Sequence, residues 1–157
     1  MRVKRQAIDM EGISYNKIMV PTDGSEYSYR AAEHAVYLAR LSGARVYVLY
    51  VIDTDLAFRS GIHYAEDVSG MEGSARNITG KIKQLCEQAG VPCEEIIAKG
   101  KPADVIVDLA GQNCVDLIVM GSLGMSAIER ALIGSVSDKV SRHAKCPVLI
   151  VHGPKSA

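Results

Sequence analysis

Three glycines and a serine in the C-terminal third of the chain form its clearest chemical signal. They follow the pattern Gly121-x2-Gly124-x9-Gly134-Ser135. Glycine backbone N–H groups can approach an anion closely, because no Cβ blocks the path and positive φ is accessible. Ser135 is a candidate helix N-cap with Asp138 at the capping-box position, which would leave first-turn N–H groups facing a phosphate. The pattern predicts a phosphate-binding loop; the alternative is ordinary loop glycines beside a simple helix cap.

A carboxylate is expected to face this loop. Asp23 lies in the turn-rich stretch Pro21-Thr22-Asp23-Gly24-Ser25, which ends the apolar run at residues 17–20. In a doubly wound sheet, ligands bind beyond the carboxyl ends of the strands, where the strand order reverses. If the strands that end at Asp23 and Gly121 are neighbours, Asp23 is placed for a ribose hydroxyl or a metal-bound water. The alternative is an aspartate that only forms the turn.

The elements that must position these residues alternate along the chain. Apolar or β-branched strands are predicted at residues 17–20, 45–52, 94–98, 116–120 and 148–151, and Ser25 is a candidate cap for the first helix. Helical spacing predicts helices at residues 28–42, 78–89, 102–111 and 135–145. This alternation calls for a parallel sheet covered on both faces through right-handed crossovers. We therefore predict a doubly wound α/β fold.

Some segments show neither helical nor strand periodicity in their apolar residues. Glycines at 61, 70 and 73 interrupt residues 53–73, which favours a mobile loop leading into a helix. Residues 126–133 are expected to form a short helical turn. The polar stretch 1–15 reads as a flexible N-terminal extension and residues 153–157 as a tail, so a single domain spans 16–152.

Charge and composition exclude several classes of protein. Lys and Arg together number 18, as do Asp and Glu, so no basic surface for nucleic acid or an anionic membrane is expected. The longest apolar run, residues 46–52, is too short to span a membrane, and the N-terminus lacks the apolar core of a signal peptide. The four cysteines form no CxxC pair. These features predict a cytoplasmic protein with reduced thiols.

Four separated motifs resemble the universal stress protein family. They are Ile-Met-Val-Pro-Thr-Asp-Gly-Ser at 18–25, Leu-Tyr-Val-Ile-Asp at 49–53, Asp-Leu-Ile-Val-Met-Gly-Ser-Leu-Gly at 116–124 with Gly-Ser-Val at 134–136, and Cys-Pro-Val-Leu-Ile-Val at 146–151. The resemblance covers about residues 15–151. It implies a five-stranded sheet in the order 3-2-1-4-5 and membership of the ATP-binding branch, with AMP or another adenine nucleotide as an alternative ligand.

The resemblance also assigns roles by position. Pro21, Thr22 and Asp23 would meet the ribose or adenine, and the backbone of Val51 would read the adenine edge. The remaining positions flank the nucleotide or hold its phosphates: Met120, Gly121, Gly124, Gly134, Ser135 and Val136. Relatives typically form homodimers through the last strand, here residues 148–151. Two positions depart from the pattern: Leu123 stands where relatives often carry His or Arg, and Gly24 is expected to loosen the turn after Asp23.

Several functions remain open at this stage. The first is a nucleotide-dependent regulatory or stress-response module that acts on an unknown protein partner. The second is a slow ATP hydrolase or phosphotransferase, but the histidines at 34, 63, 143 and 152 are scattered and supply no evident base. Asp23 could hold Mg²⁺ or Mn²⁺ through water, which is more often a binding feature than a catalytic set. The third is an interaction module with a vestigial pocket, and fold alone also leaves a flavin or electron-transfer domain open.

Overall fold

The chain folds around a single five-stranded parallel sheet with the strand order β3-β2-β1-β4-β5, as predicted. The computed structural model describes residues 11–61, 65–125 and 133–153. The strands are β1 (Lys17–Pro21), β2 (Arg45–Asp53), β3 (Cys93–Gly100), β4 (Leu117–Gly121) and β5 (Val148–Val151). The N-terminal extension, the 126–133 turn and the tail lie partly or largely outside the described residues.

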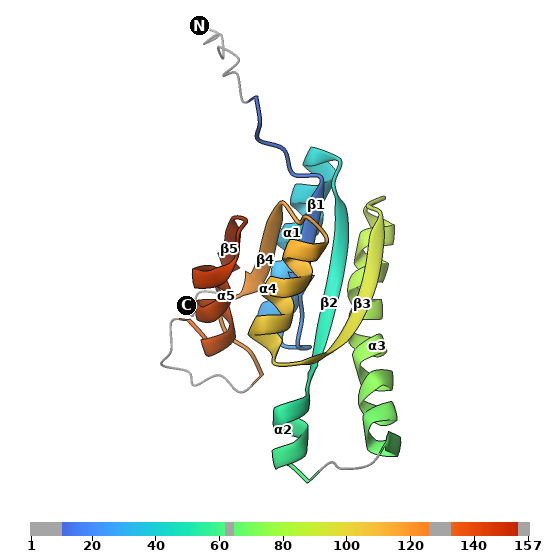
Figure 1. The fold of residues 1–157 in the computed structure, drawn as a ribbon. Coiled ribbons are helices and arrows are strands. Elements are labelled where there is room, and N and C mark those ends of the chain that lie inside the picture. The colour runs from blue at the N-terminus through green and yellow to red at the C-terminus, as the bar shows by residue number, and fades with distance from the viewer. Residues whose placement is uncertain (1–10, 62–64, 126–132, 154–157) are drawn as a thin grey trace, which may run out of the picture.

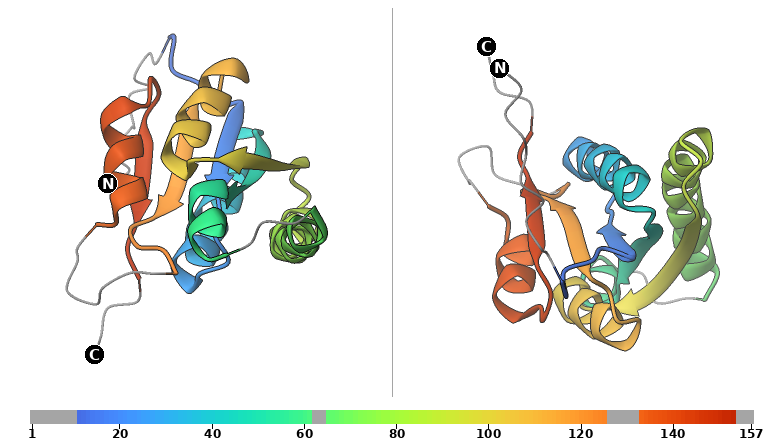
Figure 2. Two further views of the ribbon diagram at one scale, coloured as in Figure 1. Left: turned by 60° about the horizontal axis from the view of Figure 1, so that its bottom comes forward. Right: turned by 90° about the horizontal axis from the view of Figure 1, so that it is seen from above.

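Helices cover both faces of this sheet (Figures 1 and 2). They are α1 (Glu26–Ser42), α2 (Thr54–Arg59), α3 (Ala65–Gln88), α4 (Pro102–Gln112) and α5 (Ser135–His143). Helices α1 and α3 pack on one face, and α4 and α5 pack on the other. Within the described residues, no helix is long and apolar enough to cross a membrane.

The central strands are buried on both sides, which explains their continuous apolar sequences. In β1, Ile18 and Val20 belong to the cluster under α1 and α3, whereas Met19 belongs to the cluster under α4 and α5. All three side chains are fully buried. Alternate residues of a strand point to opposite faces, so a strand between two helical layers needs apolar residues at every position.

The loop predicted for residues 53–73 is wrong. Asp53 accepts a hydrogen bond from the Leu56 N–H at 3.0 Å and thereby caps α2, and α3 already begins at Ala65. Helix α3 contains Gly70 and Gly73, around which a Cβ would meet nothing within 4 Å. Burial of residues 75, 79, 82 and 86 along one face of α3 provides the packing that outweighs the glycines.

Gly24 also differs from expectation, because it makes the turn after β1 tighter rather than looser. Its φ is +83°, and a Cβ on Gly24 would lie 2.8 Å from Cδ1 of Ile78 on α3. The absence of a side chain therefore lets the turn pack directly against the helix. Ser25, the next residue, accepts the Ser28 N–H at 3.1 Å and caps α1 as predicted.

Two glycine substitutions should act in opposite directions. Gly24→Ala should lower the free energy of unfolding by about 1–2 kcal/mol, because alanine disfavours positive φ and its Cβ would crowd Ile78. Gly70→Ala, at an exposed position inside α3, should raise it by about 0.5–1 kcal/mol through helix propensity. Urea unfolding of both variants checks this, and a Gly24→Ala protein as stable as the parent would contradict the tight-turn account.

Candidate functional site

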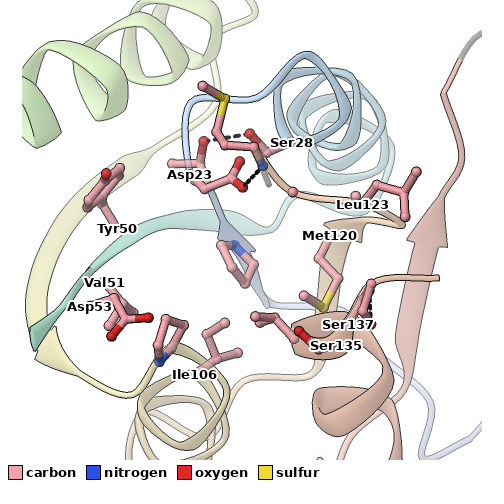
Figure 3. A pocket seen from close by; sticks show the side chains of 18 of the residues that line it. Asp23, Ser28, Tyr50, Val51, Asp53, Ile106, Met120, Leu123, Ser135 and Ser137 are labelled. Atoms are coloured by element: carbon pink, nitrogen blue, oxygen red, sulfur yellow. Dashed lines mark hydrogen bonds between the residues drawn. The ribbon is translucent and has the colours of Figure 1, made fainter. Parts of the chain in front are cut away.

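A cavity of about 680 Å³ opens at the carboxyl ends of the parallel strands. It lies where the order reverses, since β1 pairs with β2 on one side and with β4 on the other. Figure 3 shows Val51 and Asp53 on one side of this cavity and Met120 and Ser135 on another. All the residues assigned a role by resemblance line it: Pro21, Thr22, Asp23, Val51, Met120, Gly121, Gly124, Gly134, Ser135 and Val136. The fold thus brings segments more than a hundred positions apart to one site.

Asp23 joins the two loops that form the upper part of this cavity in Figure 3. Its Oδ1 accepts the Ser25 N–H at 2.9 Å, and its Oδ2 accepts the Met125 N–H at 2.9 Å. The first bond shapes the turn after β1, and the second holds the end of the glycine loop after β4. Asp23 is therefore both the turn-forming residue and the carboxylate that faces the glycine loop.

The first two loop glycines allow close packing within the protein itself. A Cβ on Gly124 would lie 2.6 Å from Asp23 Oδ2, and one on Gly121 would lie 2.8 Å from the Tyr27 backbone carbon in α1. Distances below 3 Å are not tolerated without movement of the neighbour. The glycine pattern thus has a structural cause as well as the chemical one inferred from its spacing.

Helix α5 does not begin with the predicted capping box. Its N-cap is Gly134, and Ser135 is the first helical residue. The Ser122 carbonyl accepts hydrogen bonds from the Gly134 N–H and from the Ser137 hydroxyl, the latter at 2.9 Å. The backbone at Gly134 is extended, and the helix begins only after it. Asp138 instead contacts Arg142 at 3.1 Å. The exposed Ser135 and the first turn of α5, whose N–H groups lack intrahelical acceptors, are therefore presented to the cavity.

Thr22 contributes differently from its neighbours. Its side chain is buried, its Oγ1 lies 2.9 Å from Ser28 Oγ, and it accepts the Gly24 N–H at 3.3 Å. The hydroxyl therefore ties the turn to α1. The backbone of Thr22, held by a bond from its N–H to the Leu49 carbonyl at 2.8 Å, fixes the turn against β2.

Several lining residues were missed from the sequence, among them Tyr50, Asp53 and Pro102. Burial raises the pKa of the Tyr50 phenol, and the negative charge of Asp23 raises it further. Asp53 is the last residue of β2, and Pro102 follows the carboxyl end of β3. Because parallel strands end at one edge of the sheet, the same positional rule that selected Asp23 could have selected both.

Metal ligands are sparse among the described residues, which contain no group of three or more His, Cys, Asp or Glu arranged to hold an ion. Asp23 has used one lone pair on each oxygen, and a carboxylate keeps further acceptor capacity. Its environment therefore fits a water-mediated contact with a metal carried by phosphates, but not a dedicated metal cage. The described histidines at 34, 143 and 152 do not line the cavity, and His63 lies outside the described residues.

Fold and cavity together define a doubly wound parallel α/β domain with a cavity at the switch point of its sheet, where such folds bind ligands. The sequence profile of the universal stress protein family matches residues 14–152. The chain belongs to this family.

Individual relatives agree with this assignment. Universal stress protein MJ0531 of Methanocaldococcus jannaschii is 39% identical over 145 residues, which cover 90% of this chain and 84% of that protein. The solved structure of hypothetical protein MJ0577 has a TM-score of 0.84 at 33% identity and covers 92% of this chain and 100% of its own. A universal stress protein in complex with cAMP has a TM-score of 0.69 at 30% identity, over 90% of this chain and 100% of that one.

Removal of the Asp23 carboxylate should release the glycine loop. Asp23→Ala deletes the acceptor of the Ser25 and Met125 N–H groups, so both amides should exchange with solvent faster, and the free energy of unfolding should fall by about 1–3 kcal/mol. Hydrogen exchange followed by NMR measures the first effect directly.

Asp116→Ala is the matched control. Asp116 Oδ2 also accepts two backbone N–H groups, those of Asn16 and Lys17 at 2.8 and 2.9 Å, at the start of β1. This variant should accelerate exchange at Asn16 and Lys17 but leave Met125 protected. Unchanged Met125 exchange in Asp23→Ala would show that another contact holds the loop.

Proposed function

We propose that this cavity binds adenine nucleotides, ATP among them, and that occupancy makes the protein a nucleotide-dependent regulatory module of the stress response. The observation that carries the proposal is the Asp23–Met125 hydrogen bond, which ties the glycine loop to the turn after β1. That loop, that turn and the first turn of α5 line one cavity. A helix N-terminus and glycine backbone groups favour an anion without requiring lysines. The related protein in complex with cAMP supports an adenine nucleotide as the ligand class.

In this proposal the nucleotide extends from β2 to α5. The Val51 backbone meets the adenine edge, while Pro21, Thr22 and Asp23 contact the adenine or the ribose. Phosphates lie near Gly124 and the first turn of α5. Mg²⁺ or Mn²⁺ bound to a triphosphate would neutralise part of its charge, with Asp23 in contact through water.

The nucleotide would regulate the protein if it bound one arrangement of the elements around the cavity more tightly than another. The ligand would contact the loop after β4 and the N-terminus of α5 together, and α2 also lines the cavity through Leu56 and Ala57. A ligand shifts a conformational equilibrium by its difference in affinity for the two states. A protein partner that contacts these segments would therefore sense occupancy, in the cytoplasmic setting that the sequence predicts.

Nucleotide binding is tested with protein stripped of bound small molecules. Isothermal titration with ATP, with and without Mg²⁺, should give saturable binding, and Gly124→Ala should weaken it by at least about tenfold, because its Cβ would displace Asp23 and the loop. Gly111→Ala, in α4 where a Cβ meets nothing within 4 Å, is the control and should bind normally.

The outcomes separate the candidate functions. Circular dichroism and urea unfolding establish that both variants are folded before the titration is interpreted. Absence of binding by the folded parent protein would reject the nucleotide proposal and favour an interaction module with a vestigial pocket.

We also propose that the protein forms a homodimer through β5. This strand pairs only with β4 among the described strands, and Leu149 is 37% exposed on it. An apolar edge strand left open invites pairing with another chain, and a second copy would satisfy it. Two β5 strands related by a twofold axis would form such a self-complementary interface.

A charge on this strand should therefore produce monomers. Leu149→Lys places a cation in the proposed interface, and sedimentation velocity should show a shift from dimer to monomer at micromolar concentration. Leu41→Lys, at a 69% exposed leucine on α1, should leave the dimer intact. A monomeric parent protein, or a dimeric Leu149→Lys variant, would reject this interface.

A further inference from the structure

We propose that Asp53 is a specificity-determining residue of the cavity, whose carboxylate accepts a hydrogen bond from a donor group on the nucleotide. The donor is the exocyclic amine of the base or a hydroxyl of the ribose. This inference rests on the proposed function, because it assigns a selection step to the same site.

The strand places Asp53 beside the proposed adenine contact. Asp53 is the last residue of β2 and lies two positions after Val51, so both side chains are on the same face of the sheet. Figure 3 shows them together on one side of the cavity, and both line it. A ligand read by the Val51 backbone therefore brings its polar edge or its sugar within reach of Asp53.

The Asp53 carboxylate is held in position but keeps an oxygen available. Its Oδ1 accepts the Leu56 N–H at 3.0 Å, which fixes the side chain as the N-cap of α2. Its other oxygen accepts no hydrogen bond from the residues that the structure describes, and Asp53 is half-buried. Asp23 differs, since each of its oxygens already accepts a backbone N–H.

The nearby carboxylate of Asp55 does not share these properties of Asp53. Asp55 contacts Lys101 at 3.7 Å with its side chain nearly half exposed, and it does not line the cavity. Asp53 is therefore the acidic residue of this segment that faces the ligand.

An ionised carboxylate accepts hydrogen bonds and donates none. A ligand that lacks the matching donor leaves this half-buried oxygen without a partner, and that loss is larger than the gain from an ordinary surface contact. The amine of adenine and the hydroxyls of ribose are both donors. Discrimination between otherwise identical nucleotides is therefore the property that Asp53 confers.

The experiment compares four ligands that carry the same 5′-phosphate: AMP, purine riboside monophosphate, 2′-deoxy-AMP and 3′-deoxy-AMP. Each analogue lacks one donor, the amine or one of the two hydroxyls. Affinities are measured by isothermal titration for the parent protein and for Asp53→Ser and Asp53→Asn. Serine and asparagine both cap helices well, so α2 is retained. Serine is too short to reach the ligand, and asparagine replaces one acceptor oxygen by a donor.

The parent protein should bind AMP at least about tenfold more tightly than one of the analogues, and the analogue whose ratio Asp53→Ser abolishes names the donor. Asp53→Ser should reduce this ratio to within about twofold, and Asp53→Asn should reduce it as well. Ratios between ligands of equal charge cancel the general effect of removing a negative charge. Asp55→Asn, the matched control, should retain the parent ratios.

Two negative results are distinguishable. Parent protein that binds AMP but shows no preference over any analogue, or Asp53→Ser with unchanged ratios, overturns the role of Asp53 and leaves nucleotide binding intact. Parent protein that binds none of the four ligands and no ATP overturns the proposed function itself.

Discussion

The two hydrogen bonds accepted by the Asp23 carboxylate are the constraint on which the site depends. β1 and β4 are far apart in sequence and adjacent in the sheet, and each ends in a loop at the same edge. Asp23 ties the end of the β4 loop to the turn after β1. A charge-assisted bond of this kind is stronger than a neutral one, so it can hold an irregular loop that has no regular hydrogen-bond pattern of its own.

The glycines near the Asp23 hydrogen bonds have both a packing role and a role in shaping the cavity. Gly124 approaches the Asp23 carboxylate, Gly121 approaches α1, and Gly24 lets the turn contact α3. The close approaches of Gly121 and Gly124 bring backbone rather than side chains to the cavity wall. Backbone N–H groups in a wall without large side chains can approach an anion closely. This explains how a chain of zero net charge could hold one.

Much of this fold follows from local patterns. The buried strands carry apolar residues at successive positions, Ser25 caps α1, and Pro102 opens α4, all as the sequence indicates. Two of the three predictions that the structure corrects have a common cause. Gly70 and Gly73 weaken helix propensity in α3, and Ser135 is a better N-cap residue than Gly134, yet contacts with distant segments outweigh these local preferences. The Ser122 carbonyl, which bonds to both Gly134 and Ser137, moves the start of α5.

The sequence by itself determined the order of strands and helices, and its motifs identified the family and the positions that would surround a ligand. Such features are encoded by periodicity, turn residues and short motifs, which act over a few positions. Tertiary structure alone decided which oxygen atoms are engaged and which remain available. Asp23 and Asp53 both lie at or just after the carboxyl end of a strand and look equivalent in the sequence. They differ because Met125 donates a hydrogen bond to the Asp23 carboxylate from 102 positions away, whereas the Asp53 carboxylate bonds only within its own helix cap among the described residues.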